Sequence, residues 1–143
     1  MKVSEVMNTP IVSIEPTATL GEASELMRTR NVGCLAVVDR LGYLSGIVTD
    51  RDIVIRGVAQ GRSPDAPVEG VMSRDVATVS PYADLGTAEM IMMKRGVRRL
   101  PVSDEMWRPR GMIAMDDIMR TFGHEIDTVA DTLSAQATRT TER

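Results

Sequence analysis

The sequence contains one pattern twice, and the two copies align without a gap. Residues 3–53 match residues 68–118, which lie 65 positions later, with 17 identities among 51 aligned positions. The identical pairs include Pro16/Pro81, Gly46/Gly111 and Asp52/Asp117. We expect two copies of one unit to pack around a pseudo-twofold axis, with a related pair of clefts between them. What such clefts hold depends on the residues that line them, because the same fold can carry different functions.

The hydrophobic pattern of each copy predicts the element order β-α-β-β-α, an α/β (α+β) fold class. In the first copy we expect strands at 11–14, 35–38 and 43–48, a helix over 19–30 and a second helix from residue 49. Thr19 and Glu22 have the spacing of a capping box, as do Thr49 and Asp52. The β-branched run 53–55 favours a strand, but the cap and the glycines that bound the segment favour a helix.

The second copy predicts the same elements. We expect strands at 76–79, 99–103 and 111–114 and helices at 84–95 and 115–122. The predicted organisation is a first repeat over 1–60, a linker over 61–67, a second repeat over 68–122 and a helical extension over 123–143. Ile126, Val129 and Leu133 recur at helical spacing in the extension, which we expect to pack on its own domain or on a partner subunit. The polar end ATRTTER is expected to fray.

The composition disfavours several classes of function. The net charge is −3 and aromatic residues make up 3% of the chain, so nucleic-acid binding is not expected. One cysteine, Cys34, excludes an intramolecular disulfide, and one histidine, His124, excludes a multi-histidine metal site. These counts leave little room for a nucleophile–base set, so we expect no catalysis. The pair Asp116-Asp117 is more typical of a helix start than of a metal site.

The apolar segments are short. Apolar clusters such as 36–38, 53–55 and 90–93 are far too short to cross a bilayer, and the N-terminal residues MKVSEVMNTP lack the continuous apolar stretch of a signal peptide. We therefore expect a cytoplasmic protein with no membrane association.

Residues 46–52, Gly-Ile-Val-Thr-Asp-Arg-Asp, join a predicted strand directly to a predicted helix. A helix N-terminus presents unpaired N–H groups and a partial positive charge, which attract phosphate. The Thr49 hydroxyl is suited to donate to a phosphate oxygen, and the Asp52 carboxylate to accept from ribose hydroxyls. The same spacing describes a capping box, and spacing alone favours the cap. Neither copy contains a glycine-rich phosphate loop.

Several of these motifs occur in one order that resembles a known family. They are the gap-free repeat, Pro16/Pro81, TLGEA at 19–23 with DLGTA at 84–88, GIVTDRDI at 46–53, and RRLPV at 98–102. From residue 3 to about 122 the chain resembles a tandem pair of cystathionine-β-synthase (CBS) domains, the Bateman module. The resemblance implies a regulatory module that commonly binds AMP, ADP, ATP or S-adenosylmethionine in clefts between the repeats.

The resemblance also implies which residues form the first cleft. In the family the threonine contacts phosphate and the aspartate contacts ribose, while adenine lies against the opening strand of the other repeat. Carried to this sequence, the first cleft consists of Thr49, Asp52, Asp75, Val76, Ala77, Val97, Arg98 and Arg99. Arg98 and Arg99 are adjacent in a predicted strand, so we expect at most one to face a given cleft unless the strand begins irregularly.

The second cleft departs from the family pattern. It would consist of Thr9, Pro10, Ile11, Val12, Val32, Gly33, Cys34 and Asp117. Ala114 replaces the threonine, and Gly33-Cys34 replaces the basic pair. Each charge-assisted hydrogen bond contributes ~1.5–3 kcal/mol, so we expect the second cleft to bind a phosphate ligand more weakly by orders of magnitude. Cys34 itself is expected to be a small buried hydrophobe rather than a redox site.

The sequence thus predicts a non-catalytic regulatory or signalling module that senses an adenine nucleotide, requires no cofactor and acts on an unknown protein target. The alternative is a structural dimerisation module with no nucleotide ligand. We expect a homodimer, because the family resemblance implies one. The apolar clusters Leu26-Met27 and Met90–Met93 also exceed what one helix face needs, which indicates a subunit interface.

Overall fold

The computed structural model describes residues 1–141, with the side chains of residues 1–138. Its first half contains β1 (Ser13–Ile14), α1 (Leu20–Arg30), β2 (Cys34–Val38), β3 (Leu44–Thr49), α2 (Asp50–Asp52), η2 (Ile53–Gly57) and η3 (Val58–Gln60). β1 pairs in parallel with β2, and β2 pairs antiparallel with β3. The helix α1 packs on this sheet, and Thr19 forms the predicted capping box with Glu22.

The second half repeats this arrangement with one strand fewer. After η1 (Val3–Glu5) at the N-terminus, the remaining elements are η4 (Val68–Gly70), α3 (Leu85–Arg95), β4 (Arg99–Ser103), β5 (Pro109–Ala114) and α4 (Met115–Thr141). The strand predicted at 76–79 shrinks to a single parallel bridge between Val79 and Val102. The Val76 N–H donates to the Arg74 carbonyl oxygen at 3.1 Å, so the segment begins in a turn rather than an extended strand. The mixed α/β class is confirmed.

The helix predicted after Thr49 differs from a regular α-helix. It consists of one α-helical turn followed by the π-helical turn η2 and the 3-10 turn η3. β-branched side chains crowd the preceding turn of an α-helix. The run 53–55 supplies three such side chains in a row, which is consistent with the wider turn. The strand that these residues also favour does not form.

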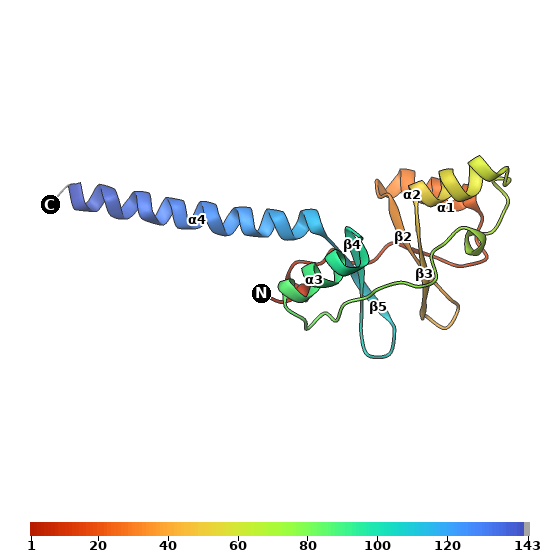
Figure 1. Ribbon diagram of the computed structural model, residues 1–143, viewed down its shortest axis with the longest axis horizontal. Helices are drawn as coiled ribbons and strands as arrows, with labels where there is room; N and C mark the ends of the chain where they lie inside the picture. Colours follow the sequence, from red (N-terminus) through yellow and green to blue (C-terminus); the bar gives the residue numbers. More distant parts are fainter. Residues whose placement is uncertain (142–143) are drawn as a thin grey trace.

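Helix α4 is longer than predicted and continuous. It runs from Met115 to Thr141, where the sequence predicted a helix ending near 122 and a separate extension. No proline interrupts it, and a Cβ at Gly123 would meet no atom within 4 Å. The outer part projects away from the rest of the chain instead of packing on its own domain (Figure 1). The helix persists to Thr141 through most of the end expected to fray, and residues 142–143 lie outside the described residues.

Each half completes the hydrophobic core of the other. Val3 is fully buried among the side chains of α3, β4 and β5, and Val68 is equally buried among those of α1, β2 and β3. The same hydrogen bond anchors both segments, from the Val3 N–H to the Ala83 oxygen at 2.8 Å and from the Val68 N–H to the Ala18 oxygen at 2.7 Å. The two halves are therefore interlocked about a pseudo-twofold axis.

Two glycines allow the crossing segment of each half to lie close against a strand of the other half. A Cβ on Gly46 would lie 2.5 Å from the Ser73 carbonyl oxygen, and a Cβ on Gly111 would lie 2.7 Å from the Asn8 carbonyl oxygen. Because these neighbours are backbone atoms held by bridge hydrogen bonds, any side chain would push the crossing segment off the strand. The glycine shared by both copies thus reflects a close backbone approach.

The apolar clusters of α1 and α3 contribute mostly to the cores. Met27 and Met92 are buried in the two cores, and Leu26 and Ile91 pack against them. Only Met90 and Met93 remain exposed, Met93 to 76%. The prediction that both clusters form a subunit interface is therefore wrong for Met27 and Met92, which are buried in the cores. Within residues 1–141, no helix is long and apolar enough to cross a membrane.

Candidate functional site

The larger of the two clefts between the halves has a volume of about 560 Å³. It lies where β3 ends, where α3 leads into β4 and where residues 73–77 cross over. All eight residues predicted for the first cleft line it, and the structure adds Cys34, Ile47, Arg51, Ser73, Arg95 and Gly96. Ile47 was recoverable from the sequence, because it lies two residues before Thr49 and therefore on the same strand face.

Thr49 and Asp52 form a complete capping box at the N-terminus of α2. The Asp52 N–H donates to the Thr49 Oγ1 at 3.1 Å, and the Thr49 N–H donates to the Asp52 Oδ2 at 2.9 Å. The capping role that the spacing of Thr49 and Asp52 predicted is therefore present. It leaves the hydroxyl proton of Thr49 free to donate. The Asp52 Oδ1 has only a distant partner, Arg56 Nε at 3.9 Å.

Four arginines give the larger cleft its charge. Arg95 is paired with Asp75 at 3.1 Å, and Arg98 is paired with Asp116 at 3.3 Å. The guanidinium groups of Arg51 and Arg99 have no ion-pair or hydrogen-bond partner among the described residues. Two unpaired guanidinium groups in one cleft favour an anionic ligand, above all one that presents phosphate oxygens.

Both Arg98 and Arg99 line this cleft, although alternation along a strand was expected to admit only one. The reason is that β4 begins at Arg99, so Arg98 precedes the strand and is not bound by its alternation. The Arg98 carbonyl oxygen accepts from the Met115 N–H at 2.8 Å, which ties this irregular residue to the start of α4.

The smaller cleft has a volume of about 280 Å³. Six of the eight residues predicted for it line it, and the structure adds Asn8, Asn31, Arg99, Met112 and Ala114. Thr9 and Asp117 do not line it. Thr9 instead packs beside Gly111, where its Cγ2 lies 3.2 Å from the position of a Cβ on that glycine.

The carboxylate of Asp117 is occupied by protein donors. Its Oδ2 accepts from the Asn8 Nδ2 at 2.8 Å and from the Ala114 N–H at 3.0 Å, and its Oδ1 accepts from Arg120 at 2.9 Å. The equivalent Asp52 lacks both side-chain hydrogen bonds. Since position 114 is alanine, the hydroxyl half of the capping box is also missing. The two clefts therefore differ in available polar groups, as well as in volume.

Comparison with known proteins identifies the family to which this architecture belongs. The CBS domain family matches residues 3–57 and 68–124. The chain belongs to the CBS domain family. It is 38% identical over 116 residues to the CBS domain-containing protein YhcV of Bacillus subtilis, covering 81% of each chain. It is 33% identical over 117 residues to hypoxic response protein 1 of Mycobacterium tuberculosis, again covering 81% of each.

Solved structures of CBS pairs share the fold. The CBS domain pair of protein MJ0100, in complex with 5'-methylthioadenosine and S-adenosyl-L-methionine, superposes with a TM-score of 0.80 at 27% identity, covering 87% of this chain and 98% of that one. Hypoxic response protein I with two coordinated zinc ions gives a TM-score of 0.77 at 30% identity, covering 84% and 98%. In this CBS pair, no three His, Cys, Asp or Glu side chains of the described residues gather to hold a metal.

Cys34 and Arg99 line both clefts of the CBS pair. They are equivalent positions of the two repeats, 65 residues apart, so the clefts adjoin where these residues lie. Burial raises the pKa of the Cys34 thiol to about 11, and the positive charge of Arg99 opposes this rise only in part. The thiol is therefore neutral at physiological pH, although Cys34 is only partly buried at the clefts and is not the fully buried residue that was expected.

We expect the Cys34 thiol to react slowly with iodoacetamide in the folded protein. At pH 8, a rise from the ordinary value of 9.0 to about 11 lowers the thiolate fraction about 100-fold. Because the folded pKa exceeds the unfolded one, the neutral thiol stabilises the fold below about pH 9, and this contribution is lost as the pH rises toward 11. Mass spectrometry of alkylation against time measures the rate. Equal rates in native and urea-unfolded protein would contradict the expectation.

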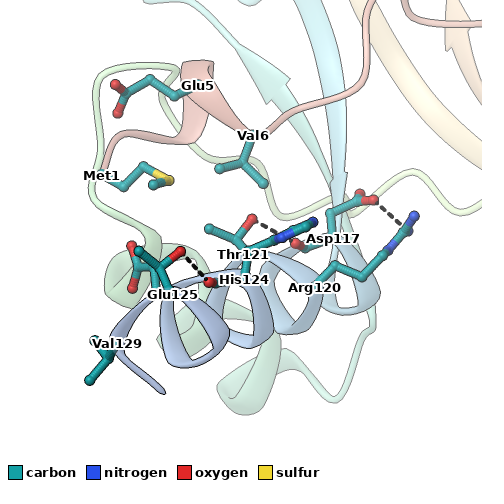
Figure 2. Close-up of a pocket in the computed structure, with 10 residues that line it drawn as sticks. Met1, Glu5, Val6, Asp117, Arg120, Thr121, His124, Glu125 and Val129 are labelled. Carbon is teal, nitrogen blue, oxygen red and sulfur yellow. Dashed lines mark hydrogen bonds and ion pairs between the residues drawn. The ribbon is translucent and has the colours of Figure 1, made fainter. Parts of the chain in front are cut away.

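A third, open groove of about 810 Å³ lies between the N-terminal segment and α4. Figure 2 shows Met1, Glu5 and Val6 on one side and the α4 residues on the other. Its hydrogen bonds run within α4, from Thr121 to the Asp117 carbonyl and from Thr128 to the His124 carbonyl. Arg120, which lines this groove, is paired with Asp117 at 2.9 Å. The groove is therefore a weaker site for an anionic ligand than the arginine-lined cleft.

Proposed function

We propose that this CBS pair is a non-catalytic regulatory module that binds an adenine nucleotide in the larger cleft between its repeats. The observation that carries the proposal is the pair of guanidinium groups of Arg51 and Arg99, which have no partner among the described residues, in a cleft that also presents the Thr49 hydroxyl. A volume of about 560 Å³ lies within the range of small-molecule sites, roughly 300–1,000 Å³.

The parts of a nucleotide fit different parts of the cleft. Phosphates would accept hydrogen bonds from the arginines and Thr49. Ribose hydroxyls would donate to the Asp52 Oδ1, which has only a distant partner. Adenine fits the apolar wall formed by Val76, Ala77 and Val97. The related pair of protein MJ0100, solved with two adenosyl ligands, supports an adenosine moiety. The arginines favour a phosphate-bearing ligand over the sulfonium cation of S-adenosylmethionine, because like charges repel in a partly enclosed site.

Binding in this cleft has a route to regulation. The ligand would contact β3 and α2 of the first repeat and the start of β4 in the second, so its affinity depends on how the repeats are packed. A ligand that prefers one packing shifts the population toward it and alters the surface offered to a protein target. The alternative, a structural module without a nucleotide, is supported by the complete capping box, which explains Thr49 and Asp52 without a ligand.

Isothermal titration of the full-length protein with AMP, ADP, ATP, S-adenosylmethionine and 5'-methylthioadenosine tests the proposal. We expect one site per chain and tighter binding of the phosphate-bearing ligands than of 5'-methylthioadenosine, which has none. The bound nucleotide should also raise the melting temperature, since it binds only the folded chain. If no member of the panel binds or raises the melting temperature at millimolar concentration, the structural module is the better description.

A further inference from the structure

Helix α4 carries an apolar stripe that the described residues leave largely exposed. Met119, Phe122, Ile126, Val129 and Leu133 lie on one face of the helix and are each between 41% and 68% exposed. We call these five residues the α4 seam. The outer half of α4 stands clear of both repeats (Figure 1). A single helix that leaves its neighbours is marginally stable in water, so the fold implies a partner for it.

The spacing of the seam identifies the kind of partner. Its residues are separated by 3, 4, 3 and 4 positions, which is the two-in-seven pattern of a coiled coil rather than the broader stripe of a helix on a globular core. At 1.5 Å per residue, 27 residues extend about 40 Å. Beside the seam, Gly123 and Ala130 lie seven residues apart and add little bulk, so a second helix can approach closely.

Most charges of α4 lie away from the seam. At 100° per residue, Arg120, Asp127 and Asp131 fall on the opposite face. Asp116 and Glu125 flank the seam, and the five seam positions themselves carry no charge. Between residues 115 and 138 the helix has five acidic side chains and one arginine. Helices that lie on anionic membranes are rich in Lys and Arg, so this balance disfavours a lipid surface.

We propose that the α4 seam pairs with the α4 seam of a second copy of this chain, forming a two-helix coiled coil that joins two CBS pairs. A second copy supplies a seam with the same spacing and length, and with no charged residue among its five positions. Below the coiled coil, the exposed Met90 and Met93 lie on α3, which contacts α4. The interaction is independent of the nucleotide cleft, because none of the five seam residues lines it.

Light scattering on the full-length protein tests this pairing. We expect the wild-type mass to be at least twice the chain mass of 15.6 kDa and the Ile126→Glu/Leu133→Glu variant to have half the wild-type mass. The matched control, Thr128→Glu/Ser134→Glu, adds the same two charges to exposed positions off the seam and should keep the wild-type mass. Both seam positions are exposed, so the variants fold, and circular dichroism should report a loss of helix only in the seam variant.

Cross-linking checks that the two seams touch. In a Cys34→Ser background, Ile126→Cys lies mid-seam and should join two chains through a short bismaleimide in either helix orientation, whereas Asp127→Cys on the opposite face should not. A wild-type mass of 15.6 kDa at all concentrations, or a seam variant that keeps the wild-type mass, overturns the proposal. Co-sedimentation of a monomeric wild type with phosphatidylserine vesicles overturns it in favour of a membrane surface.

Discussion

Gly111→Ala is expected to destabilise the protein by about 1–3 kcal/mol, the range for an overpacked core, and Gly46→Ala by a similar amount. The new Cβ at position 111 would lie 2.7 Å from the Asn8 carbonyl oxygen and 3.0 Å from the Met7 Sδ. Met7 can rotate, but the Asn8 backbone is held by two hydrogen bonds with Met112, at 2.8 and 3.1 Å. The crossing segment must therefore shift. Urea titration followed by circular dichroism measures the change in the free energy of unfolding.

Gly86→Ala is the matched control. Gly86 lies in α3, and a Cβ there would meet no atom within 4 Å. Because alanine is the better helix former, this substitution should stabilise the protein by about 0.5–1 kcal/mol. Gly111→Ala should lower stability and Gly86→Ala should raise it. The pair of variants therefore distinguishes a steric clash with a neighbouring backbone from the intrinsic helix preference of alanine over glycine. If Gly111→Ala unfolds at the same urea concentration as the wild type, the interlocked crossing does not constrain the strand as described.

Asp52→Ala is expected to lower nucleotide affinity by ten- to a hundredfold, about 1.5–3 kcal/mol for the loss of an ionised acceptor. The same substitution removes half of the capping box and should lower stability by about 0.5–2 kcal/mol. Titration calorimetry and urea unfolding on the same variant measure the two effects. Asp52→Asn keeps an acceptor oxygen for the Thr49 N–H, so it should retain more stability while still losing affinity.

Asp117→Ala provides the control in the other half. Its carboxylate is occupied by Asn8, Ala114 and Arg120, so the substitution should lower stability but leave nucleotide affinity nearly unchanged. A loss of affinity equal to that of Asp52→Ala would place the ligand elsewhere. A stability loss in Asp52→Ala with no effect on ligand binding would favour the structural module.

Local pattern was sufficient to predict much of this protein. The repeat, the two long helices α1 and α3 and both hairpins follow from periodicity and turn residues over short stretches of chain. The capping boxes at Thr19 and Thr49 were also predictable, since both partners lie three residues apart. The repeat and the family resemblance together predicted the eight residues that line the larger cleft, because equivalent strand ends lie 65 positions apart in the two copies.

The tertiary structure decided what depends on the path of the chain. The contact of Val3 with α3, β4 and β5 joins residues about 80 to 110 positions apart, and no short pattern encodes it. The same crossing brings the Asn8 side chain onto Asp117, which removes that carboxylate from the second cleft. The residues by themselves determined most of the helices and both hairpins, because those choices rest on neighbours within a few positions. The partners of Asp117, the need for Gly111 and the uncovered face of α4 were decided only in three dimensions, because each depends on segments that folding brings together or leaves apart.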